Sequence, residues 1–157
     1  METLDLIQGT PEWHAHRATH DNASDAPVML GLSPYKTRED LLHERHTGIV
    51  PEVAPDQQKR FDDGHRFEAL ARPLAEDIIG EPLYPVTGCQ GTLSASFDGL
   101  TALDDVAYEH KTLNAGLRAI MSRSCTGADL PELYRVQMEQ QCMVAGCRKV
   151  LFIASKW

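Results

Sequence analysis

Residues 83–112, LYPVTGCQGTLSASFDGLTALDDVAYEHKT, decide the fold of this chain. Three short runs within this stretch, 83–86, 92–98 and 105–112, are bounded by glycine or acidic turn residues, which is typical of strands. The connections between them are short enough for the three strands to form an antiparallel meander. The sequence therefore predicts a sheet in which two neighbouring strands carry acidic residues.

Helices are predicted on either side of this meander. Apolar residues recur at helical spacing over about 56–79, and Pro73 is expected to kink or split this longest helix near Ala69. Shorter helices are predicted before it, each with a start signal at its N-terminal end. They run from the cap Thr10 to about His20, from the cap Ser24 to Gly31, and from the capping box of Thr37 and Asp40 to Gly48.

The segment after the meander completes the predicted fold. Helices are expected over about 113–123 and 131–145, and the apolar run 149–154 predicts a buried last strand. A crossover through a helix to this strand makes the sheet mixed. The fold class is therefore α/β, a mixed central β-sheet flanked by helices. At 157 residues one domain is expected, with N-terminal helices in 1–50 and the core in 56–157.

The composition is that of a soluble globular protein, 42% hydrophobic and 24% charged, without an apolar run long enough to span a membrane. The start of the chain lacks the pattern of a signal peptide, so a cytoplasmic protein with reduced, mostly buried cysteines is expected. The net charge of −8 argues against broad electrostatic attraction to nucleic acid. Any binding to DNA must therefore be local.

Acidic residues gather on the last two strands of the meander. Glu109 and Lys111 lie on the same face of their strand, while His110 turns away. Asp98 precedes a glycine at the end of the neighbouring strand. Glu68 lies at the margin of the apolar stripe of the long helix, where small residues let it point toward the sheet. Two or three carboxylates suit Mg²⁺, and the lysine can act on a water or a phosphate.

Simpler interpretations exist for these residues taken one at a time. Glu109 and Lys111 can be an exposed ion pair, and Asp98 can be a turn former. A separate histidine cluster, His14, His16 and His20, has no further ligand at a useful spacing, so zinc is not expected there.

The order of the acidic residues resembles a known signature. Asp98, ten intervening residues and then Glu109-His110-Lys111 are similar to the PD-(D/E)XK nuclease pattern. Further segments resemble the YqaJ-like viral recombinase family, the family of the phage lambda exonuclease, over nearly the whole chain. They are Trp13-His14-Ala15-His16-Arg17, Ser24-Asp25-Ala26, Leu30 to Thr37, Thr47-Gly48, Gly64 to Glu68, Ala95 to Leu100, Glu109 to Lys111 and Tyr134-x-x-Gln137.

The resemblance implies a restriction-endonuclease-like core and a set of catalytic residues. Glu68, Asp98 and Glu109 are implied to bind Mg²⁺, for which Mn²⁺ can substitute, and Lys111 is implied to be the catalytic lysine. In the downstream helix the family's glutamine motif falls on Gln137. A second motif glutamine is replaced by Glu139, which either adds a carboxylate or marks a shifted register.

Two N-terminal residues are implied to bind the 5′-phosphate of a DNA end. They are Arg17 and Ser24, and a helix N-cap beside an arginine fork suits an anion physically. The alternative is a plain cap and a surface arginine. Trp13, one turn before Arg17, is expected to anchor its helix to the core rather than to stack on a base.

The implied function is a Mg²⁺-dependent exonuclease that degrades linear duplex DNA from 5′ ends and feeds a single-strand annealing protein in phage-type recombination. Local DNA contacts are expected from basic residues such as Lys59, Arg60 and Arg66. The alternatives are an endonuclease of the same superfamily and a non-catalytic DNA-end-binding module. The family's ring-shaped trimer is in doubt because the chain stops soon after its last predicted strand, as a minimal module or a fragment would.

Overall fold

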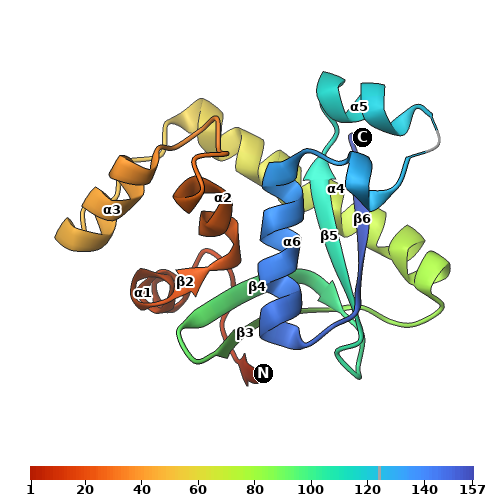
Figure 1. The fold of residues 1–157 in the computed structure, drawn as a ribbon, viewed down its shortest axis with the longest axis horizontal. Helices are drawn as coiled ribbons and strands as arrows, with labels where there is room; N and C mark the ends of the chain where they lie inside the picture. The colour runs from red at the N-terminus through yellow and green to blue at the C-terminus, as the bar shows by residue number, and fades with distance from the viewer. Residues whose placement is uncertain (124) are drawn as a thin grey trace.

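A mixed sheet with the strand order β1-β3-β4-β5-β6 organises the computed structural model, which describes residues 1–123 and 125–157 (Figure 1). The predicted meander is confirmed: the three central strands pair antiparallel in chain order. The last strand pairs parallel with β5, as the helical crossover requires. The central strands and the last one are β3 (Tyr84–Gln90), β4 (Leu93–Leu100), β5 (Val106–Thr112) and β6 (Lys149–Ser155).

Two further strands were not predicted. β1 (Glu2–Leu4) pairs antiparallel with β3, and β2 (Asp21–Asn22) pairs parallel with β4. Strands of three and two residues are too short to display a period of two, so their pairing comes from tertiary contacts.

The ladder between β4 and β5 is short. The two strands pair only at Gly99 with Tyr108 and at Leu100 with Ala107. Beyond these pairs β4 bends away from β5, and Figure 1 shows the two arrows separating. A fork therefore opens between the strands beside Asp98, and this fork positions the site described below.

Helices cover both faces of the sheet. α6 (Glu132–Ala145) lies in front of the sheet in Figure 1, and α4 (Pro55–Ile79) lies behind it. The alternation of side chains along β5 sends Ala107 into the core beneath α6, and Tyr108 into the core against α4. Each core layer therefore ties one helix to the strands that border the fork.

Helix α4 corrects one expectation, because it is not split at Pro73. It runs unbroken for 25 residues, with Pro73 exposed in its interior. The buried residues Phe67, Ala71 and Ala75 pack on both sides of the proline. This packing offsets the hydrogen bond that a proline removes from a helix.

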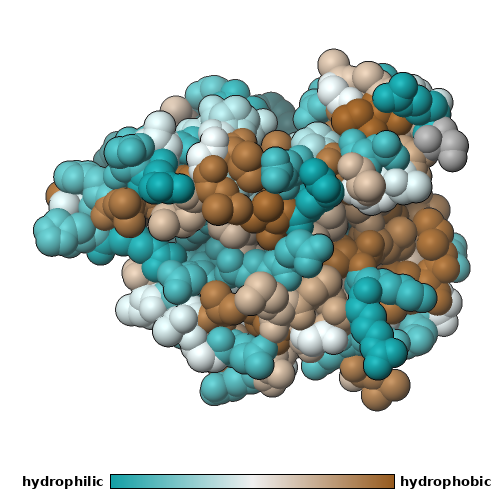
Figure 2. All heavy atoms as spheres, viewed as in Figure 1, coloured by the Kyte–Doolittle hydropathy of each residue, from teal (hydrophilic) through white to brown (hydrophobic). Residues whose placement is uncertain are grey.

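The N-terminal third forms a group of short helices beside β4. α1 (Pro11–Thr19) begins at the cap Thr10, and α3 (Arg38–Thr47) begins at the predicted capping box and ends at Gly48. Figure 1 shows α3 projecting away from the sheet. Figure 2 shows a mainly hydrophilic surface over α3, and hydrophobic side chains both near α2 and near the end of α4.

The predicted cap at Ser24 is wrong. Ser24 lies inside a 3-10 turn, Ala23–Asp25, and α2 (Ala26–Met29) starts only after that turn. Pro27 stands in the first turn of α2, where proline is favoured, and it fixes the start of the helix there.

The remaining connection between β5 and α6 contains α5 (Ala115–Met121) and a 3-10 turn, Gly127–Asp129. Within residues 1–123 and 125–157, the structure contains no helix that combines the length and apolar character needed to cross a membrane.

Candidate active site

A buried carboxylate lies in the middle of β5. Glu109 is only 2% exposed, so it does not belong to a solvent-exposed ion pair. Lys111, on the same face of the strand, donates a hydrogen bond from Nζ to Glu109 Oε1 at 2.5 Å. His110 lies between them, and its Nε2 is 2.9 Å from Ser155 Oγ. A charge at this depth requires several compensating partners.

Helix α6 supplies two of these partners. Gln137 Nε2 donates to Glu109 Oε1, and Gln141 Nε2 donates to Glu109 Oε2, each at 2.6 Å. Residues four apart share one helix face, so both amides reach the same carboxylate. Gln141 was missed in the sequence, although its spacing from Gln137 could have identified it. It is fully buried, and its Oε1 has no hydrogen-bond partner among the described residues.

Glu139 lies apart from this cluster. It is exposed and lines an open cleft of about 660 Å³ between α6, β6, Met121 and residues 125–130. Residues two apart on a helix are rotated by about 200°, so Glu139 cannot share the face of Gln137. Glu139 therefore adds no carboxylate to this cluster, and the second amide beside Glu109 comes from Gln141.

Asp98 occupies the fork between β4 and β5. Its Oδ2 accepts a hydrogen bond from the backbone N–H of His110 at 2.7 Å, where the ladder has already stopped. Gly99 permits this arrangement, because a Cβ at that position would lie 2.8 Å from Leu83 Cβ. The side chain of Asp98 thus replaces the missing backbone hydrogen bond between β4 and β5, and it lies opposite Glu109 along the two strands.

Glu68 approaches from α4. Its Oε1 accepts a hydrogen bond from an Arg72 guanidinium nitrogen at 2.8 Å. Arg72 Nε also donates to the carbonyl oxygen of Asp98 at 3.3 Å, so one side chain links Glu68 to β4. The small, fully buried Ala71 lets the helix lie close to the sheet, and the Tyr108 hydroxyl is 3.5 Å from the Glu68 carbonyl oxygen. The predicted inward position of Glu68 matches this geometry, whereas Arg72 was missed.

Negative charge exceeds positive charge in the fork. Burial raises the pKa of Asp98 well above its ordinary value, and the carboxylates of Glu109 and Glu68 raise it further. Burial alone would lower the pKa of Lys111, but the carboxylates of Glu109 and Asp98 outweigh this effect and raise it. Lys111 is therefore an ammonium group beside two or three acids that repel one another.

The donor set suits a hard divalent cation. As the side chains stand, no group of three or more His, Cys, Asp or Glu residues in 1–123 and 125–157 is arranged to hold a metal ion. The carboxylates in the fork are oxygen donors of the kind that Mg²⁺ prefers, and a cation there would offset the repulsion that acts on Asp98. The chemistry of the fork thus fits such an ion.

The N-terminal histidines are engaged with one another and with β4. The rings of His16 and His20 stack at 3.9 Å, and His16 Nε2 is 2.9 Å from Ser94 Oγ. The His14 ring packs edge-on against Trp13. All four cysteines are free; Cys89 and Cys147 are buried, and Cys125 and Cys142 are partly exposed.

Arg17 and Ser24 meet, although Ser24 is not a cap. A guanidinium nitrogen of Arg17 donates to Ser24 Oγ at 2.9 Å. The Arg17 guanidinium also lies 4.6 Å from the centre of the Trp13 ring. Trp13 donates from its indole N–H to Ser96 Oγ at 3.0 Å and remains partly exposed. It therefore anchors α1 to β4 through a polar contact rather than by burial in the core.

Strand β4 connects the two groups of residues. Ser96, which holds Trp13 beside Arg17, is two residues before Asp98 in the fork. We call Arg17 and Ser24 the serine–arginine group. Strand β4 thus links this group, through Trp13, to the acidic residues of the fork. Two further residues lie beside Arg17. Asp25 belongs to one of the segments that resemble the family but was given no role, and Arg45 had no sequence signal, because α3 brings it to this place through tertiary structure alone.

Comparison with known proteins identifies the family. The sequence matches the model of the YqaJ-like viral recombinase domain over residues 12–148. No curated protein matches the chain in sequence. The fold is similar to the crystal structure of an alkaline exonuclease, LHK-Exo from Laribacter hongkongensis, with a TM-score of 0.67 and 23% identity over 92% of this chain and 73% of that one. LHK-Exo in complex with dAMP matches with a TM-score of 0.67 and 22% identity over the same shares.

The matched fold has a restriction-endonuclease-like core, as the sequence predicted. The family match extends from α1 to the residue before β6, so it includes both the fork and the serine–arginine group. This chain belongs to the YqaJ-like viral recombinase domain family.

Proposed function

We propose that this protein is a Mg²⁺-dependent exonuclease that hydrolyses phosphodiester bonds of linear duplex DNA from 5′ ends. The observation that carries the proposal is the fork, where Glu109 and Lys111 lie beside Asp98 in a buried, acid-rich setting. Membership in the recombinase family supports a nuclease, and the similar LHK-Exo is described as an alkaline exonuclease.

Asp98, Glu109 and Glu68 would hold the Mg²⁺, and Mn²⁺ would substitute for it. When bound, such an ion lowers the pKa of a coordinated water and offsets charge on the phosphate. Gln137 and Gln141 fix the orientation of Glu109 through its two oxygens. A carboxylate held on both oxygens is pre-organised, so little reorganisation is needed when the substrate arrives.

Lys111 supplies positive charge at the same place. Its Nζ already contacts Glu109, and the raised pKa of Lys111 keeps this group protonated. An ammonium group here orients the attacking water by hydrogen bonding and offsets negative charge that develops on the phosphate. The lysine is therefore expected to affect turnover more than the binding of DNA.

Arg17 and Ser24 would grip the 5′-phosphate. The guanidinium and the hydroxyl lie 2.9 Å apart, so one phosphate can contact both. An arginine fork binds phosphate through two parallel hydrogen bonds. A grip of this kind, on elements that Trp13 and Ser96 tie to the strand of Asp98, would direct cleavage to DNA ends, and it is compatible with a chain whose net charge is −8.

The proposal is tested with linear duplexes that carry 5′-phosphate or 5′-hydroxyl ends and with closed circular DNA. We expect loss of linear DNA in Mg²⁺, faster for phosphorylated ends, no loss in EDTA, and none with Lys111→Ala. The exposed Lys149→Ala, at the start of β6, serves as the matched lysine control. Activity of Lys111→Ala equal to that of the wild type would overturn the assignment of the fork.

Two alternatives are separated by the same assay. Cleavage of closed circles would instead identify an endonuclease with the same acidic site. Inactivity of the intact chain together with binding to DNA ends would identify a non-catalytic DNA-end-binding module.

A further inference from the structure

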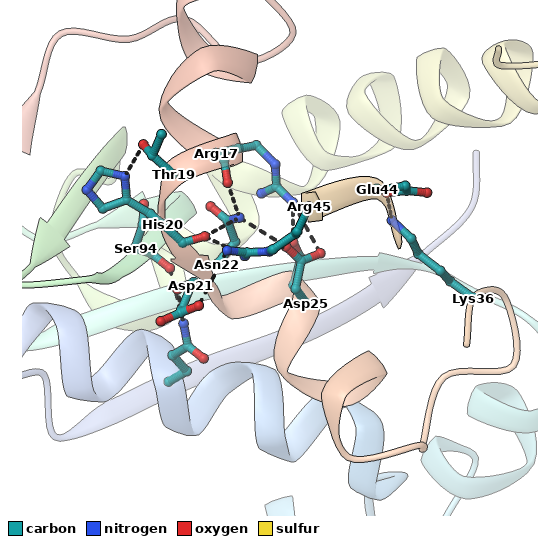
Figure 3. A network of polar contacts seen from close by, with 12 residues as sticks. Arg17, Thr19, His20, Asp21, Asn22, Asp25, Lys36, Glu44, Arg45 and Ser94 are labelled. Atoms are coloured by element: carbon teal, nitrogen blue, oxygen red, sulfur yellow. Dashed lines mark hydrogen bonds and ion pairs between the residues drawn. The ribbon is translucent and has the colours of Figure 1, made fainter. Parts of the chain in front are cut away.

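Two guanidinium groups from different helices converge on one carboxylate beside the serine–arginine group. Arg17 of α1 approaches Asp25 Oδ1 at 3.5 Å, and Arg45 of α3 approaches Asp25 Oδ2 at 3.5 Å. Figure 3 shows the Asp25 carboxylate lying among the side chains of Arg17, Arg45 and Asn22. The group in which a terminal phosphate is proposed to bind therefore already contains an anion.

The two sides of this carboxylate are held unequally. Oδ2 accepts a hydrogen bond from Asn22 Nδ2 at 3.0 Å in addition to its contact with Arg45. Among the residues that the structure describes, Oδ1 contacts only Arg17, and 3.5 Å is long for a charge-assisted hydrogen bond. Arg17 makes its shorter bond, 2.9 Å, to Ser24. The contact of Arg17 with Asp25 is as long as that of Arg45, but it lacks a second donor such as Asn22, and it is the one that a phosphate would have to replace.

Arg45 is fixed independently of Arg17. Its guanidinium donates to the carbonyl oxygen of His20 at 2.5 Å and lies 3.4 Å from an Asp21 carboxylate oxygen. Asn22, the other partner of Asp25, is buried and also donates to the carbonyl oxygens of Arg17 and His20. Arg45 and Asn22 therefore have contacts of their own that keep them in place, and they can hold Asp25 when Arg17 releases it.

We propose that Asp25 is a resident counter-ion that competes with the terminal 5′-phosphate for Arg17, and that Arg45 is the positioning residue that retains Asp25 during the exchange. This inference rests on the proposed binding of a 5′-phosphate by Arg17 and Ser24. The ligand is a phosphate monoester, close to a dianion at neutral pH, rather than the singly charged diester inside a strand. Asp25 keeps the grip reversible, as an enzyme needs when each cleavage creates a new end.

The first test is Asp25→Asn, which preserves the shape of the side chain and removes its charge. Binding to duplexes with 5′-phosphate and 5′-hydroxyl ends is measured by fluorescence anisotropy in EDTA, so that no cleavage occurs. We expect the phosphorylated duplex to bind about three- to tenfold more tightly, and the hydroxyl duplex to change much less. The ratio of the two dissociation constants therefore increases.

The second test is Arg45→Met, alone and with Asp25→Asn. Without Arg45, Asp25 shifts toward Arg17, so the preference for phosphorylated ends falls about three- to tenfold. Adding Asp25→Asn removes the competitor and restores the preference to at least the wild-type ratio. Damage to the fold would not be repaired in this way, and thermal unfolding of each variant checks the fold directly.

Glu44→Gln is the matched control, because it also removes one negative charge but Glu44 pairs with Lys36 rather than with Arg17. It should leave the ratio unchanged. An unchanged or lower ratio in Asp25→Asn, with a wild type that prefers phosphorylated ends, overturns the counter-ion proposal alone. A wild type without that preference overturns the 5′-phosphate grip as well.

Discussion

Gly99 is the position at which a single methyl group should disturb the fork most. A Cβ there would lie 2.8 Å from Leu83 Cβ and 3.4 Å from Tyr108 Cδ1. A Cβ atom cannot rotate away from such a contact, so the backbone of β4 must move. We therefore predict that Gly99→Ala destabilises the protein by about 2 kcal/mol, the middle of the range for overpacking a filled core.

This destabilisation corresponds to a fall in melting temperature of about 4–8 °C for a domain of this size. The activity should fall further, by about 10- to 100-fold at a temperature where the variant is still folded, because Asp98 is the neighbouring residue and misplaced catalytic groups lose rate steeply. Thermal unfolding followed by circular dichroism, with exonuclease assays at 20 °C below each midpoint, measures both effects.

Gly127→Ala is the control for this prediction. Its φ is not positive, and a Cβ there would meet no described atom within 4 Å, so its melting temperature should match that of the wild type. A Gly99→Ala variant as stable as this control would refute the packing argument. A destabilised variant with full activity would refute the link between Gly99 and Asp98.

Three further predictions follow from the hydrogen bonds of the site and of α3. Gln141→Glu places a second buried carboxylate against Glu109, so it should destabilise the protein by about 2–4 kcal/mol at pH 7, measured by urea unfolding. The pKa of the added acid is raised in the folded state. The destabilisation should therefore be smaller at pH 5, where the folded protein binds the extra proton more readily than the unfolded chain does. Gln137→Met should lower kcat about tenfold with less change in KM, since Lys111 still contacts the same oxygen of Glu109; an unchanged kcat would contradict the role given to this amide. Thr37→Ala removes the cap of α3 and should lower the melting temperature by about 2–4 °C. The pKa of Asp40 in that capping box is lowered by its hydrogen bonds to Thr37, so the wild-type cap is fully stabilising above about pH 4, and the difference between the two proteins should shrink as the pH falls through the lowered pKa.

Local signals were the most predictive part of the sequence. The predicted caps Thr10 and Thr37 begin α1 and α3, and the predicted Gly48 ends α3. These signals are reliable because a cap depends only on the backbone groups next to it in the chain. Ser24 failed as a cap because Pro27 fixes the start of α2 later in the chain. Pro73 did not split α4 because the helix is held by its packing on the sheet, which cannot be predicted from the neighbouring residues in the sequence.

The candidate site was predictable where spacing along one element decides contact. Glu109 and Lys111 share a strand face, and Gln137 reaches the same carboxylate from α6. The pairing of Asp25 with Arg45 depends on how α3 folds back, and no pattern in the sequence specifies that path. Likewise, the fork at Asp98 depends on where the ladder between β4 and β5 stops, which tertiary packing decides.

The parallel pairing of β5 with β6 also sets the order of events during folding. Tyr108 pairs with Leu151, so the ladder joins residues far apart in the chain, and contacts of this kind form late in folding because a long loop must close first. Gln137 and Gln141 lie on that loop. Until it closes, Glu109 stays hydrated and without its amide partners. During refolding, nuclease activity should therefore return with the slowest kinetic phase rather than with the formation of the helices.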